Sequence, residues 1–156
     1  MTIGFLRHAE AEDVAASDFG RRLTTKGLEQ AAKVGKFCMR NGFVPDLIIT
    51  SPVVRARQTA EIVAETTECE LVEGSWLACG MEAADCFKEI AALSQKNFVI
   101  LVGHEPDFSE VIGCLIGLID PSCLKIRKAS LTVVDIAATE QGCGQLQFMI
   151  PARLMS

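Results

Sequence analysis

Residues 97–110 read NFVILVGHEPDFSE, and this stretch decides which fold class the sequence predicts. Its first half is a continuous apolar run, which is typical of a β-strand buried on both faces of a sheet. His104 follows the run directly. The spacing of Asp107 and Glu110 is that of a capping box, so we expect a helix from Asp107 to about Leu118. A buried strand, a short turn and a helix together form the repeating unit of α/β sheets.

The same alternation extends outward along the chain. Further strands are predicted at 2–6, 46–50, 130–138 and 145–152, with a weak one inside 69–77, and further helices at 25–40, 51–66 and 82–93. A Gly-rich turn separates the last two strands, which predicts a hairpin. No internal repeat or linker interrupts the pattern. We therefore expect residues 1–156 to form a single α/β domain with a largely parallel central sheet.

Local signals suggest how two of the helices begin and pack. The Ser51-Pro52 pair predicts a helix start, with Ser51 as N-cap and Pro52 at the first helical position. In the helix at 25–40 one side collects small and apolar residues and is expected to face the core; its members are Leu28, Ala31, Ala32, Gly35 and Phe37.

Composition narrows the class of protein. The net charge is −5 and the chain has no tyrosine and one tryptophan, which argues against a nucleic-acid binder. Its apolar runs are far shorter than the roughly 20 residues that cross a bilayer, and the start lacks the pattern of a signal peptide. A cytoplasmic protein is therefore expected.

Seven cysteines are scattered without a C-x-x-C pair, at positions 38, 69, 79, 86, 114, 123 and 143. Zinc sites and disulfide frameworks need closer or more regular spacing. The expectation is reduced and mostly buried thiols.

Charged and polar residues converge on one edge of the predicted sheet. Arg7 and His8 end the first strand, His104 ends the strand at 98–103, and Arg55 lies in the first turn of a helix that follows another strand. Ligands of such sheets bind beyond the carboxyl ends of the strands. Two histidines and two arginines at that edge predict an anion site suited to phosphate.

Helix geometry separates the two arginines of the SPVVRARQT string. Arg57 lies two residues beyond Arg55, about 200° around the helix, so both cannot face one pocket. Thr59, four residues after Arg55, does share its side. We therefore expect Arg55 in the site and Arg57 in solvent or an ion pair.

The chain resembles the histidine phosphatase superfamily (phosphoglycerate-mutase-like), and within it the SixA-type phosphohistidine phosphatases. The resemblance rests on four strings in the expected order, LRHAEAE at 6–12, RRLTTKGLEQA at 21–31, IITSPVVRARQTAEIV at 48–63 and VILVGHEPDFS at 99–109. It implies a three-layer αβα sandwich around a mostly parallel mixed sheet.

The resemblance also implies roles for particular residues. His8 matches the nucleophile that takes up the phosphoryl group, and Arg7 matches its neighbouring phosphate ligand. Arg55 and His104 match the second arginine and the second histidine, and Arg21 resembles a further arginine near the phosphate. The family needs no metal or other cofactor.

Two departures from the family pattern bear on function. Ala9 stands where the superfamily usually has glycine, a position that varies among SixA-type proteins. Phosphomonoesterase members supply an acidic proton donor, for which this chain offers only positional candidates, namely Glu82, Asp85, Glu10 and Glu105. Phosphohistidine tolerates a missing acid better than an alkyl ester, because its imidazole leaves neutral once protonated.

The sequence leaves four hypotheses about the function. The first is a phosphatase acting on phosphohistidine in a signalling or phosphotransfer protein, through an open rim without a long lid insertion. The second keeps the nucleophile but takes a small-molecule phosphate ester. The third is a metallohydrolase built on His8, His104 and nearby carboxylates, for which the sequence offers no defined third ligand. The fourth is a phosphate-binding module without turnover.

Overall fold

The computed structural model describes residues 1–156 and consists of six strands and four α-helices. The strands are β1 (Thr2–Arg7), β2 (Leu47–Thr50), β3 (Leu71–Glu73), β4 (Phe98–Gly103), β5 (Ser130–Ile136) and β6 (Gly144–Pro151). The helices are α1 (Thr25–Asn41), α2 (Val54–Thr67), α3 (Ala83–Ala92) and α4 (Asp107–Ile116). Three 3₁₀ turns are added, η1 (Ser75–Leu77), η2 (Pro121–Cys123) and η3 (Ala152–Leu154).

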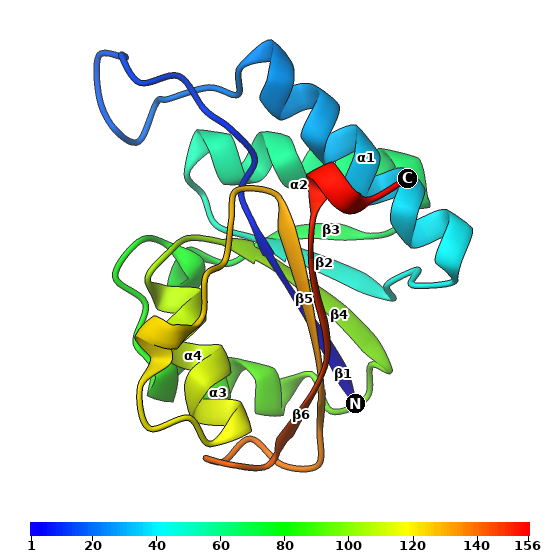
Figure 1. Cartoon of the computed structure of the whole chain (residues 1–156), viewed down its shortest axis with the longest axis vertical. Coiled ribbons are helices and arrows are strands. Elements are labelled where there is room, and N and C mark those ends of the chain that lie inside the picture. Colours follow the sequence, from blue (N-terminus) through cyan, green and yellow to red (C-terminus); the bar gives the residue numbers. More distant parts are fainter.

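All six strands form one mixed sheet in the order β3-β2-β4-β1-β5-β6. Strands β3, β2, β4 and β1 are parallel, whereas β5 runs antiparallel to both β1 and β6. Since β1 and β4 pair with Arg7 opposite Gly103, the two strands end level with each other. This edge lies at the upper end of β1 in Figure 1.

The helices cover both faces of the sheet and make three layers, with α1 and α2 on one side and α3 and α4 on the other (Figure 1). Alternate residues of each strand face opposite sides. In β1, Leu6 packs in the core under α1 and α2, while Ile3 and Phe5 pack in the core that includes α3 and α4. The prediction of an α/β sandwich with a mostly parallel mixed sheet is confirmed.

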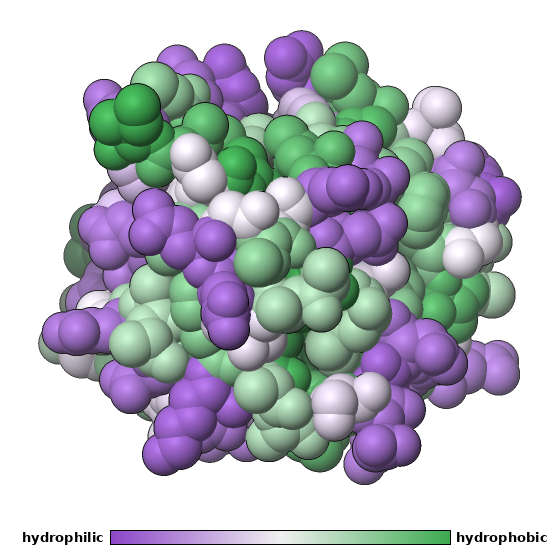
Figure 2. Space-filling model, turned by 90° about the horizontal axis from the view of Figure 1, so that it is seen from below, coloured by the Kyte–Doolittle hydropathy of each residue, from purple (hydrophilic) through white to green (hydrophobic).

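The opposite end of the sheet, seen in Figure 2, mixes hydrophobic and hydrophilic residues across the surface. A cavity of about 390 Å³ lies at that end among Met1, Ile90 and Ile136, mostly between hydrophobic side chains. None of the helices is both long and apolar enough to cross a membrane.

Besides the N-cap predicted for the helix after β2, three sequence predictions about local structure were wrong. The expected capping box at Asp107 and Glu110 does not form, because Asp107 is already inside α4 and its carboxylate accepts from the backbone N–H groups of Gly80 and Met81. The Asp107 carboxylate thus binds a loop that is distant in the sequence and does not cap its own helix. Leu28 is 44% exposed, since the buried side of α1 follows Ala31, Val34 and Cys38 instead.

The third wrong prediction concerns the thiols. All seven cysteines are free, but only Cys38 and Cys86 are buried. Cys79 and Cys123 are exposed, and the remaining three are partly buried. Most of the cysteines lie in loops or at the ends of elements, where the general tendency of cysteine to be buried does not hold.

Candidate active site

Three neighbouring parallel strands each deliver a polar residue to the same edge. His8 directly follows β1, Ser51 follows β2 and His104 follows β4. The imidazole rings of His8 and His104 lie 5.3 Å apart between centroids and are inclined by 51°. The two histidines of the chain, 96 positions apart in the sequence (104 − 8), therefore form one pair, as the strand pattern predicts.

His8 is held in a single useful orientation. Its side chain is almost fully buried, and its Nδ1 lies 2.8 Å from the carbonyl oxygen of Ala9. A carbonyl only accepts, so Nδ1 carries the proton and the lone pair is on Nε2. Arg55 Nε donates to that Nε2 at 3.3 Å. The nitrogen able to attack an electrophile thus points at a guanidinium.

Burial keeps both rings neutral. It lowers the pKa of His8 to about 3, and the cationic Arg55 together with His104 and Arg7 acts in the same direction, while the bond to Ala9 opposes the shift. For His104, burial and then Arg55 lower the pKa to about 4. The neutral imidazole, which is the nucleophilic form, therefore dominates at pH 7.

His104 has one partner and one open nitrogen. Its Nε2 lies 2.8 Å from the Ser51 hydroxyl oxygen, whereas its Nδ1 is buried without a hydrogen-bond partner. Ser51 was predicted as the N-cap of α2, and this prediction was wrong. The helix starts at Val54 with Val53 as N-cap, and Ser51 Oγ accepts from the backbone N–H of Val53 in the turn before it.

Arg55 extends from the first turn of α2 into the site and is 6% exposed. Its two terminal nitrogens donate to the backbone oxygen of Asp18 at 2.8 Å and to the Asp18 carboxylate at 3.2 Å. Arg57 instead points outward and lies 3.8 Å from Glu61 and 4.0 Å from Glu73. The predicted separation of the two arginines is confirmed.

Thr59 connects α2 to the turn that carries the first histidine. Its hydroxyl donates to the backbone oxygen of Arg55 at 2.7 Å and accepts from the backbone N–H of Ala9 at 3.0 Å. The predicted placement of Thr59 on the same side as Arg55 is confirmed. This one hydroxyl fixes the His8 turn relative to the helix that supplies the guanidinium.

The predicted arginine at position 21 reaches the site through an intermediary. Arg21 donates to the backbone oxygen of Glu12 at 2.6 Å and to the Asp18 carboxylate at 3.0 Å. Asp18 therefore links Arg21 to Arg55, and Arg55 in turn lowers the pKa of the Asp18 carboxyl. Asp18 was not among the predicted site residues, although it stands in the same SDFGRR string as Arg21.

Arg7 and Glu105 occupy the β1 and β4 side of the site. One terminal nitrogen of Arg7 donates to the backbone oxygen of Ile126 at 2.8 Å, and its Nε is buried without a partner. Glu105 is half-buried and receives a hydrogen bond from the Ser109 hydroxyl at 2.8 Å. Burial raises the pKa of Glu105, against the opposing effects of Ser109 and Arg7.

The other candidate acids are placed less favourably. Glu10 is bonded to Lys26 at 2.8 Å, and that contact lowers the pKa of its carboxyl. Glu82 and Asp85 lie exposed at the start of α3. No group of three or more histidine, cysteine, aspartate or glutamate side chains forms a set that could hold a metal ion.

Comparison with known proteins agrees with the fold and the site motifs. The family model described as histidine phosphatase superfamily (branch 1) matches residues 3–78. A phosphohistidine phosphatase SixA homolog of Haemophilus influenzae is 30% identical over 132 residues, covering 78% of this chain and 80% of its own. An uncharacterised protein of Picosynechococcus is 35% identical over 115 residues, covering 70% of each chain.

A solved structure, the protein histidine phosphatase SixA complexed with tungstate, superposes with a TM-score of 0.91. The match covers 100% of both chains at 20% identity, which shows a shared fold. The family model and the 30% identical Haemophilus influenzae relative show that the chain belongs to the histidine phosphatase superfamily. Within that superfamily its relatives place it with the SixA-type proteins.

Asp18 is expected to compete with phosphate for Arg55. The Asp18 carboxylate, on a side chain that is 66% exposed, pairs with the nearly buried guanidinium of Arg55, whereas the Asp18 backbone oxygen would keep the loop in place after truncation. We expect Asp18→Ala to tighten inhibition by inorganic phosphate about 2- to 5-fold, the range of an exposed ion pair. Asp13→Ala, a change in the same exposed loop, serves as control, and weaker phosphate inhibition in Asp18→Ala would contradict the expectation.

Proposed function

We propose that the protein hydrolyses phosphohistidine on a phosphotransfer or signalling protein through a covalent phospho-His8 intermediate. The observation that carries the proposal is the orientation of His8, whose protonated Nδ1 is bound to the Ala9 carbonyl while the unprotonated Nε2 faces Arg55. Among relatives covering most of the chain, the Haemophilus influenzae protein is named a phosphohistidine phosphatase homolog.

The reaction proceeds in two displacements at phosphorus. In the first, His8 Nε2 bonds to phosphorus and the phosphorus–nitrogen bond of the substrate breaks, and the substrate imidazole takes up a proton from solvent so that it leaves neutral. In the second, a water oxygen bonds to phosphorus, the bond from phosphorus to His8 Nε2 breaks, and inorganic phosphate and neutral His8 are released while one proton of the water returns to solvent. In the transition state of both steps, the negative charge of the transferring phosphoryl group lies on its equatorial oxygens.

The surrounding residues suit that charge. Arg7 and Arg55 present guanidinium groups, which bind phosphate in pairs of hydrogen bonds. His104 keeps Nδ1 buried without a partner, and a phosphoryl oxygen of the substrate would satisfy it. Arg21 contributes to phosphate binding through Asp18, which bonds both Arg21 and Arg55. Once phosphate displaces the Asp18 carboxylate, Arg21 binds the phosphate directly. No metal takes part in either step.

A second candidate is the hydrolysis of a small-molecule phosphate ester. It is favoured by Glu105, a half-buried carboxyl beside Arg7 whose pKa is raised by burial, because an ester oxygen needs a proton as it leaves. The two candidates differ in their response to Glu105→Gln. Loss of ester hydrolysis with phosphohistidine turnover unchanged would assign Glu105 to an ester reaction.

A substrate panel tests the proposed function. We expect hydrolysis of a histidine-phosphorylated protein domain at a kcat/KM well above that of sugar phosphates and an aryl phosphate, and full activity in excess chelator. If the phosphoprotein is not hydrolysed while a small ester is hydrolysed efficiently, the second candidate function replaces the first. Loss of activity in chelator would reject the metal-free chemistry.

The pH profile follows from the lowered pKa of His8. The neutral ring is the active form, and its pKa of about 3 keeps it neutral as the pH falls through the ordinary range of histidine. We therefore expect kcat/KM for an aryl phosphate, after correction for substrate ionisation, to stay level between pH 8 and pH 5 and to fall only in stronger acid. An acid limb centred near pH 6.5 would contradict a buried, neutral nucleophile.

A further inference from the structure

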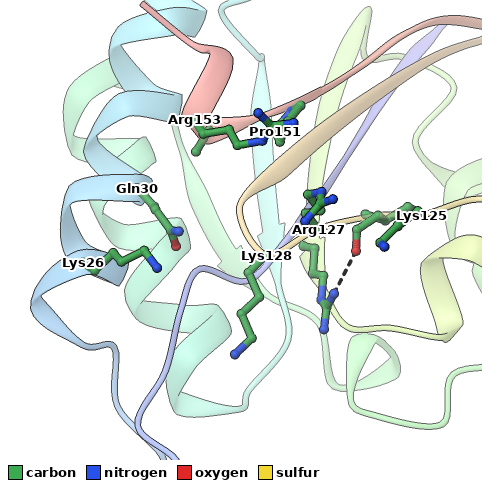
Figure 3. A pocket seen from close by; sticks show the side chains of 10 residues that line it. Lys26, Gln30, Lys125, Arg127, Lys128, Pro151 and Arg153 are labelled. Atoms are coloured by element: carbon green, nitrogen blue, oxygen red, sulfur yellow. Dashed lines mark hydrogen bonds between the residues drawn. The ribbon is translucent and has the colours of Figure 1, made fainter.

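A second cationic region adjoins the site at Arg7. A cavity of about 460 Å³ opens between α1, the segment 125–128 before β5, and η3 (Figure 3). Six basic residues line it, namely Arg7, Lys26, Lys125, Arg127, Lys128 and Arg153. We call this cavity the basic groove.

Arg7 belongs to both regions. It ends β1 next to His8, and its guanidinium also lines the basic groove, where one terminal nitrogen donates to the Ile126 backbone oxygen, the dashed bond in Figure 3. The segment 125–128 is thereby tied to the end of β1. A ligand bound through Arg7 in the site is consequently next to the basic groove.

The charge of the basic groove is only partly balanced by the protein. No acidic residue lines it, and only Lys26 of the six makes an ion pair, with Glu10. The whole chain carries a net charge of −5, so a cavity lined by six cations is a local concentration against the overall trend. Unpaired cations in one cavity repel each other and attract an anionic partner.

The shape points to an extended partner. Lys26, Lys125, Arg127 and Arg153 are exposed and come from three separate parts of the chain. Figure 3 shows Lys26 and Gln30 extending from α1 toward Lys128, with Arg153 above them and Arg127 and Lys125 on the opposite side. Charges spread over an open surface in this way suit several carboxylates better than one small anion.

We propose that the basic groove docks an acidic surface segment of the phosphoprotein substrate, next to the phosphohistidine that enters the site. The proposal rests on the proposed function and adds the chemistry by which the protein partner is recognised. Docking in the basic groove contributes to KM and to the salt dependence of turnover. Surface charges, which salt screens, affect the association of the two proteins more than the chemical step.

The test compares two triple charge reversals with the same change in net charge. The groove variant combines Lys125→Glu, Arg127→Glu and Arg153→Glu. The control variant combines Lys36→Glu, Arg40→Glu and Lys88→Glu, three exposed residues outside the groove. The probes are a histidine-phosphorylated phosphotransfer domain with an acidic surface, free phosphohistidine and inorganic phosphate.

For the phosphorylated domain, we expect the groove variant to raise KM on the order of 10-fold at low salt, with kcat unchanged, and the control variant to change KM less than 3-fold. Hydrolysis of free phosphohistidine and inhibition by inorganic phosphate should stay within 2-fold of wild type. Equal effects of the two variants would overturn the proposal. An equal loss on free phosphohistidine would also overturn it, by showing that the groove serves the small anion.

Binding separates this proposal from the proposed function. The affinity of the unphosphorylated domain for wild type and for both variants is measured by titration calorimetry at low salt, where no turnover is involved. We expect only the groove variant to lose affinity. The docking proposal is refuted if the domain does not bind wild type, or if the groove variant binds it as tightly as wild type does. If binding depends on the groove but the phosphorylated domain is not hydrolysed, only the proposed function is refuted.

Discussion

Replacing His8 by alanine is expected to lower kcat for phosphohistidine by at least about 10³-fold and to abolish the phosphoenzyme. The substitution removes the only imidazole nitrogen that faces Arg55 with a free lone pair. Removing a covalent nucleophile usually leaves only the residual rate that charge stabilisation and binding supply. Brief exposure of wild type to labelled substrate should give an acid-labile, base-stable adduct that is missing in His8→Ala.

Because His8 is buried, the alanine variant leaves a cavity, and a second variant guards against misfolding. His8→Asn keeps most of the volume and places an amide donor near the carbonyl of Ala9. It should fold like wild type by circular dichroism and be equally inactive. A labelled adduct in either variant, or kcat within 10-fold of wild type, would remove His8 from the nucleophile role.

The second large effect is expected at Arg55. By analogy with oxyanion donors, Arg55→Ala should cost roughly 3 kcal/mol of barrier, or about 100-fold in kcat/KM. Arg55→Lys should recover only part of this loss, since a single ammonium cannot reproduce the planar fork. Removing the guanidinium also removes a positive charge that lowers the pKa of His8 and His104, so the acid limb of the pH profile should move upward.

The chain offers a matched control two residues away. Arg57 is on the same helix but points outward, with weak contacts to Glu61 and Glu73. Arg57→Ala is expected to leave kcat/KM within about 2-fold of wild type, because exposed ion pairs contribute little. Comparable losses in Arg55→Ala and Arg57→Ala would mean that the effect comes from the helix or from net charge, not from the site.

Much of the site geometry was predictable because it depends on short spacings along the chain. Each of His8 and His104 follows a buried parallel strand directly, and parallel strands end at one edge of the sheet. The angle between Arg55 and Arg57 follows from helix periodicity alone. The catalytic roles themselves are still predictions, which the variants above test.

The wrong cap predictions and the missed Asp18 contact depend on contacts between distant segments. Ser51 and Asp107 had the spacing of helix caps, but their side chains bond to His104 and to the loop at Gly80 instead. Asp18 reaches Arg55 only because the loop before α1 folds back over the start of α2. A cap signal in the sequence cannot show that another segment offers a competing partner.

The sequence by itself therefore determined the layered α/β fold and the meeting of two histidines and Arg55 at one strand edge, since hydrophobic periodicity and strand direction are local properties. Only the tertiary structure decided the Asp18 bridge, the exposed thiols and the basic groove. The groove combines α1, the segment 125–128 and η3, which are far apart in the sequence. Their cations become neighbours through packing, which no spacing along the chain encodes.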